Sequence, residues 1–152
     1  MIRYAPLFLL AACNSFPPES KSYLKLDYKA VRKMVQSAAP KGSTVWMHGL
    51  NDSVPVESDE HSYLRIFDVR TSGPLDRSLL RRAFTSRIKR YGGKAKVDHE
   101  SDRGFTITYT AESKKEVYTP VRKTITYKLT GFVELTVKGL HTYEIMVREA
   151  KD

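Results

Sequence analysis

Few residues in this chain carry side chains suited to nucleophilic, redox or metal chemistry. The 152 residues include one cysteine, Cys13, and four histidines: His48, His61, His99 and His141. No two histidines stand at a metal-binding spacing, and a lone cysteine completes neither a zinc site nor an internal disulfide. We therefore expect no metal and no cofactor, and we interpret each histidine as a turn or strand-end residue.

The sequence also lacks the common signatures of catalytic and nucleotide-binding sites. It has no GxSxG nucleophile elbow, no Walker loop and no dinucleotide fingerprint. In HESDRG, residues 99–104, a histidine stands near two carboxylates, but Ser, Asp and Gly between strands are typical of a turn. The acidic segment 49–60 lacks the ordered oxygen spacing of a calcium loop, so we interpret it as solvated. We nominate no catalytic residue and expect the protein not to be an enzyme.

The surroundings of Cys13 are those of a secretory signal. Residues 1–12 read MIRYAPLFLLAA, in which Arg3 supplies a positive charge, an apolar run follows, and small residues precede the cysteine. The run is too short to cross a bilayer, and nowhere else does the chain approach the ~18–20 apolar residues that a spanning helix needs.

The end of this segment, Leu10-Ala11-Ala12-Cys13, resembles the lipobox of bacterial lipoprotein precursors, and all four positions match. The resemblance implies that diacylglycerol is added to the Cys13 sulfur. Cleavage would follow Ala12, and Cys13 would become an N-terminus carrying acyl chains such as palmitate, two or three of which anchor a protein stably. The alternative is a helical or frayed N-terminus with an incidental cysteine.

The same resemblance gives a location and a domain plan. Asn14 follows the cysteine, where an aspartate favours inner-membrane retention in enterobacterial lipoproteins, so we expect anchoring at the cell outer membrane, facing the periplasm. Residues 1–12 would be the signal peptide, and residues 13–22, with Pro17-Pro18, the lipidated N-terminus and a flexible tether. Residues 23–152 would form a single domain.

Hydrophobic periodicity predicts two helices in that domain. Apolar residues at helical spacing predict a helix over residues 25–38, ended by Pro40 and Gly42. A second helix is introduced by Ser72-Gly73-Pro74 and stopped by Gly92-Gly93. Its expected apolar stripe is Leu80, Phe84, Ile88 and Tyr91.

Alternating segments predict the strands. We expect them at 43–48, 62–70, 94–97 and 105–111, then, after a loop, at 125–137, and last in the segment containing Tyr143, Ile145 and Val147. One face of the best strands is apolar and the other is rich in Thr and Lys, which calls for helices on a single side. The fold class is therefore α+β: a two-layer domain, mainly antiparallel sheet with two amphipathic helices on one face.

The second helix is also the most basic part of a chain whose formal net charge is +9. Between Arg77 and Lys96 there are eight basic residues and no acidic one. Like charges one turn apart repel, so a balancing anion or acidic partner is expected. The candidate anion- or partner-binding residues are Arg77, Arg81, Arg82, Lys89 and Arg90. The alternative is an ordinary solvated helix face screened by salt.

Three functions follow from these patterns. The first is a membrane-anchored, non-enzymatic binding or scaffolding accessory of a cell-envelope assembly. Its partners would be the membrane, through the lipid anchor, and an envelope protein or anionic lipid such as lipopolysaccharide, with no nucleic acid. The architecture loosely resembles the small lipoprotein of the lipopolysaccharide-export complex, without that family's closing C-terminal helix. The second is an envelope enzyme acting on peptidoglycan or lipid. The third, if the N-terminus only mimics a signal, is a basic nucleic-acid-binding protein.

Overall fold

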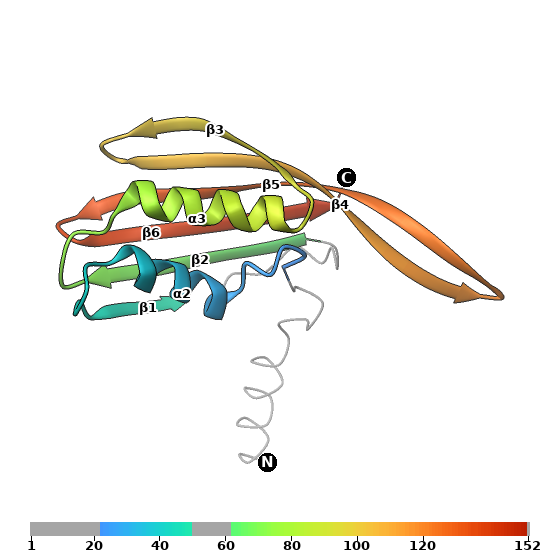
Figure 1. Cartoon of the computed structure of the whole chain (residues 1–152), viewed down its shortest axis with the longest axis horizontal. Coiled ribbons are helices and arrows are strands. Elements are labelled where there is room, and N and C mark those ends of the chain that lie inside the picture. Colours follow the sequence, from blue (N-terminus) through green and yellow to red (C-terminus); the bar gives the residue numbers. More distant parts are fainter. Residues whose placement is uncertain (1–21, 50–61, 152) are drawn as a thin grey trace, which may run out of the picture.

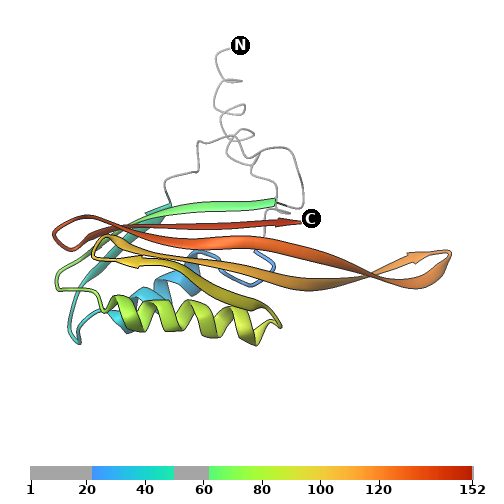
Figure 2. The ribbon, with the colours of Figure 1, turned by 90° about the horizontal axis from the view of Figure 1, so that it is seen from above.

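The computed structural model describes residues 22–49 and 62–151. These contain two helices, α2 (Tyr28–Ala38) and α3 (Arg77–Arg90), and six strands: β1 (Val45–Gly49), β2 (Ser62–Thr71), β3 (Lys94–Ser101), β4 (Gly104–Thr119), β5 (Val121–Gly139) and β6 (Thr142–Lys151). The strands form one antiparallel sheet in the order β1-β2-β6-β5-β4-β3, and both helices pack on the same face of it (Figures 1 and 2). The predicted α+β fold class is confirmed. Neither helix has the length and apolar character that a membrane span requires.

Each helix begins at an aspartate rather than where the hydrophobic pattern begins. The side chain of Asp27 accepts a hydrogen bond from the N–H of Ala30 at 2.9 Å, and that of Asp76 accepts one from Leu79 at 3.0 Å. The first helix was predicted from residue 25, which is wrong because Lys25 has a left-handed φ of 57° that interrupts helical geometry. Pro74 lies ahead of the Asp76 cap, so it precedes the first turn of α3.

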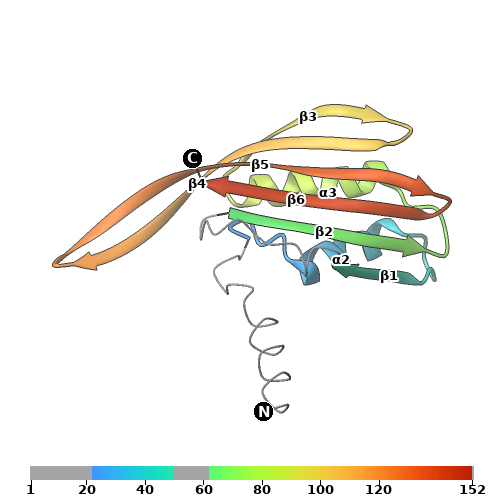
Figure 3. The ribbon, with the colours of Figure 1, turned by 180° about the vertical axis from the view of Figure 1, so that it is seen from behind.

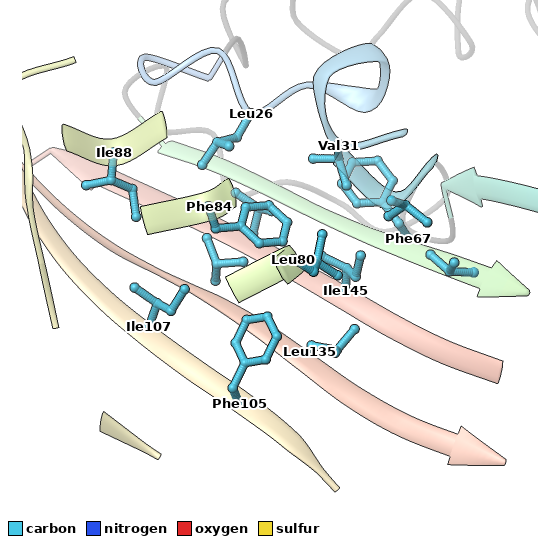
Figure 4. Close-up of a cluster of buried hydrophobic side chains, with 14 of the residues drawn as sticks. Leu26, Val31, Phe67, Leu80, Phe84, Ile88, Phe105, Ile107, Leu135 and Ile145 are labelled. Atoms are coloured by element: carbon cyan, nitrogen blue, oxygen red, sulfur yellow. The ribbon is translucent and has the colours of Figure 1, made fainter. Parts of the chain in front are cut away.

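The core lies between α3, α2 and the sheet (Figure 4). Leu80, Phe84 and Ile88 on α3 are fully buried, and the Phe84 ring lies 6.5 Å from that of Phe105 on β4. These three residues confirm most of the predicted stripe. Tyr91 does not belong to it, because it is the residue that caps α3 and it is 38% exposed.

Strands extend into two segments that were expected to be irregular. The predicted turn within 99–104 is confirmed at Asp102–Arg103, but its bounds were too wide, because β3 continues to Ser101, with a register shift between Val97 and His99. The loop expected before residue 125 is wrong: β4 and β5 stay paired without interruption to Thr119↔Val121. Residues 112–128 therefore form a two-stranded ribbon that projects past the rest of the sheet, here named the arm (Figures 1 and 3).

Candidate functional site

A buried carboxylate holds the first described residues of the chain. Glu149, on the helix-facing side of β6, is fully buried. One of its oxygens accepts a hydrogen bond from the Ser22 hydroxyl, and the other accepts one from the Tyr23 N–H at 2.7 Å. Ser22 Oγ in turn accepts from the N–H of Leu26 at 2.8 Å. We name Ser22, Tyr23 and Glu149 the clamp; it includes Ser22, which the sequence assigned to the tether.

Tyrosine hydroxyls complete the polar surroundings of the clamp. Tyr109 lies against Glu149 and donates to the Arg148 carbonyl at 2.9 Å, and Tyr63 donates to the Leu26 carbonyl at 3.0 Å. Burial raises the pKa of both tyrosines well above the ordinary value, so both hydroxyls remain donors. Among the described residues, no buried side-chain nitrogen or oxygen lacks a partner. The clamp is therefore a satisfied polar network in which nothing is left over to receive a ligand.

The clamp makes stability depend on pH. Burial raises the pKa of Glu149 above its ordinary 4.5, against the opposing effect of its hydrogen bonds from Ser22, Tyr23 and Leu24. The folded chain therefore holds this proton more tightly than the unfolded chain. The resulting stability is fully present below about pH 4.5 and is lost as the pH rises through the folded pKa.

Glu149→Gln removes this titration while keeping the shape of the side chain. We expect the wild type to lose stability relative to Glu149→Gln as the pH is raised from about 4.5, the ordinary pKa of this carboxyl, through its higher pKa in the folded chain. Urea unfolding of both chains at a series of pH values measures the difference, in which all other titrating groups cancel. Parallel stability curves for the two chains would contradict the assignment.

The basic residues of α3 divide into two groups. Arg77 donates to the carbonyls of Ser101 and Asp102, the latter at 2.6 Å, and Arg81 forms an ion pair with Glu100. Both arginines thus tie α3 to the end of β3. They are bonded within the molecule rather than held open for an external anion.

The second group points outward. Arg82, Lys89 and Arg90 are exposed on α3. Arg87 lies over the Tyr91 ring, with 5.8 Å from its guanidinium carbon to the ring centre. Of the five predicted anion- or partner-binding residues, the structure leaves these three, Arg82, Lys89 and Arg90, on an accessible cationic surface.

No described segment lies over the sheet face opposite the helices (Figure 3), and one part of this face gathers basic side chains. Paired positions run across four strands: Lys96 opposite Thr108, Thr108 opposite Phe132, and Phe132 opposite Arg148. These side chains help to line a shallow depression of about 630 Å³, together with Lys94 and Thr110. Lys96 is partly neutralised by Asp98 at 3.6 Å. Threonine hydroxyls, an aromatic ring and two further cations make this depression suited to an acidic or amphipathic partner.

A smaller depression at the β1 end of the same face is lined by Trp46 and Leu140, whose side chains are 55% and 87% exposed. His48 lies beside it, 3.8 Å from Asp68, and Arg70 lies 3.9 Å from the same carboxylate. Tryptophan is a residue type enriched at protein interfaces.

The other histidines do not assemble a site. His99 and His141 lie on β3 and in the turn between β5 and β6, while His61 and nearly all of the acidic segment 49–60 fall outside the described residues. Within 22–49 and 62–151, no group of three His, Cys, Asp or Glu side chains is placed to hold a metal ion.

Two features were missed in the sequence, the clamp and the arm. A signal for the clamp was present, because Glu149 continues the alternation of Tyr143, Ile145 and Val147 on the buried face of β6.

Comparison of the chain with protein-family models, with curated proteins and with solved structures finds no match to any of them.

Proposed function

We propose that the protein is a lipoprotein of the bacterial envelope, anchored through acylated Cys13 and acting as a non-enzymatic binding or scaffolding accessory. The observation that carries the proposal is the four-residue match Leu10-Ala11-Ala12-Cys13 behind a charged and apolar leader. Asn14 supports the outer membrane, on its periplasmic side, as the location.

The folded domain supports this proposal by where the clamp holds the chain. The clamp fixes Ser22, nine positions after Cys13, to the buried end of β6. A chain spans at most ~3.5 Å per residue, so the clamp lies within about 30 Å of the acylated cysteine. The anchor would therefore hold the domain close to the membrane surface.

The exposed surfaces support a docking role. The uncovered sheet face combines Phe132, Arg148 and Trp46, and these residue types are enriched at protein interfaces. The partner proposed for this face is an acidic envelope protein, since Lys94 and Arg148 flank the depression. Arg82, Lys89 and Arg90 on α3 provide a separate cationic surface on the opposite side of the domain.

Cys13→Ser tests the anchor. We expect this variant, expressed in the native host, to be lost from the outer-membrane fraction, because no acyl chain can be attached to the serine. Asn14→Asp is the matched control, since it alters the neighbouring residue and leaves the sulfur in place. That variant should remain membrane-bound but shift toward the inner membrane in a host that sorts as enterobacteria do. Retention of Cys13→Ser in the outer membrane would overturn the proposal.

A further inference from the structure

The arm has no core of its own. Among the described residues its strands pair only with each other, from Glu112↔Lys128 to Thr119↔Val121. A two-stranded hairpin alone is marginally stable in water. At its tip Tyr118 and Val121 are each 68% exposed, on either side of Pro120. The tip is thus a small apolar surface displayed away from the rest of the domain.

The flanks of the arm are cationic. Residues 112–128 contain five basic and two acidic residues, a formal charge of +3. Glu116 is neutralised by Arg122 at 2.7 Å, and the Arg122 guanidinium lies over the Tyr118 ring. Lys114, Lys123 and Lys128 are exposed behind the tip. An apolar, aromatic tip with lysines behind it is the pattern of segments that lie at a membrane interface.

The arm leaves the sheet beside the clamp. Glu149 pairs with Gly131 and Gly131 with Tyr109, so all three lie in one line across the sheet. The arm begins only a few residues beyond this line, at the Glu112↔Lys128 pair. From Tyr109 to Thr119 the strand rises ~3.4 Å per residue, or about 34 Å. That reach matches the greatest height of about 30 Å at which residues 13–22 can hold the clamp above the membrane.

We propose that the arm binds the anionic phospholipid surface of the membrane that holds the anchor, with Tyr118 and Val121 at the depth of the headgroups. This inference rests on the proposed lipid anchor for the choice of surface. A second copy of the chain is disfavoured as the occupant, because lysines and a proline along strand edges discourage edge-to-edge pairing. Each lysine of the arm that lies near an anionic surface adds about as much to the binding free energy as the next, so removing lysines should weaken binding stepwise.

Vesicle flotation tests the inference on the full chain carrying Cys13→Ser, so that binding does not depend on acylation. We expect at least about tenfold tighter binding to phosphatidylcholine vesicles containing about one-quarter phosphatidylglycerol than to phosphatidylcholine alone. Lys114→Glu with Lys123→Glu should abolish that preference, and Val121→Asp should weaken binding to the anionic vesicles. The matched control is Lys29→Glu with Lys33→Glu, which changes the net charge equally at two exposed positions of α2 and should alter binding by less than about twofold. Unchanged urea midpoints would show that each variant remains folded.

Four results would overturn the inference. They are the absence of vesicle binding, equal losses from the arm pair and the α2 pair, arm-dependent binding of duplex DNA that is tighter than vesicle binding, and an arm-dependent dimer. The fate of the anchor is measured separately, by fractionation of the Cys13→Ser variant in the native host. Failure of the arm and failure of the anchor are therefore distinguishable.

Discussion

Replacing Glu149 by alanine will lower the free energy of unfolding by about 2–4 kcal/mol, because it leaves buried hydrogen-bond donors without an acceptor. Its two oxygens accept from the Ser22 hydroxyl and the Tyr23 N–H, and alanine supplies no replacement acceptor. The first described residues would lose their attachment to β6. Urea unfolding of the full chain carrying Cys13→Ser measures the loss, and hydrogen exchange at Leu26, whose N–H bonds Ser22 Oγ, should accelerate.

Glu144→Ala is the matched control for this result. Glu144 lies on the same strand but on the uncovered face, half-buried, with Lys138 Nζ 3.9 Å from its carboxylate. An ion pair of this kind contributes less than about 1 kcal/mol. Equal effects of the two alanine substitutions would show that burial of Glu149 has no special role in holding Ser22 and Tyr23.

Gly131→Ala should destabilise the domain by about 3 kcal/mol, because it overpacks a site with no free space. A Cβ at residue 131 would lie 2.1 Å from the carbonyl oxygen of Arg148 and 2.5 Å from the Tyr109 hydroxyl. The carbonyl belongs to the neighbouring strand and accepts the hydrogen bond from the Tyr109 hydroxyl. Moving either atom away from the new Cβ would therefore weaken that hydrogen bond. Glycine at this position is what allows Tyr109 to lie across β5 against Glu149.

Gly139→Ala provides the control on the same strand. The nearest atom to a Cβ there is Thr142 Cβ at 4.0 Å, which is ordinary contact. We expect no loss of stability and a small gain from reduced freedom of the unfolded chain. Thermal or urea unfolding of the two variants side by side separates steric exclusion from a general intolerance of β5 to alanine, and a tolerant Gly131→Ala would contradict the packing described here.

The regular parts of the fold were predictable because their periodicity is strong. Leu80, Phe84 and Ile88 recur at helical spacing, and Phe105 and Ile107 alternate as a half-buried strand requires. Residues 112–124 of the arm could not be found this way, because their described side chains, except that of Val117, are exposed. Cross-strand pairs such as Glu116–Arg122 contribute to holding the ribbon together.

The sites were harder to predict because long-range contacts decide them. Ser22 and Glu149 are 127 residues apart, and a glutamate near the end of a chain is usually solvated. Arg77 and Arg81 looked available on a basic helix, whereas their partners are carbonyls and a carboxylate at the end of β3. The spacing of residues along α3 predicts which side chains share a face of the helix, but it does not predict which strand that face contacts.

The most direct test of the central proposal is the intact mass of the protein purified from its native host, with membrane and soluble fractions analysed separately. A chain beginning at Cys13 and carrying added acyl mass, in the membrane fraction, is the result that the lipoprotein assignment predicts. A full-length, unmodified chain beginning at Met1 in the soluble fraction would contradict it and would direct attention to the nucleic-acid alternative, measured as binding at graded salt.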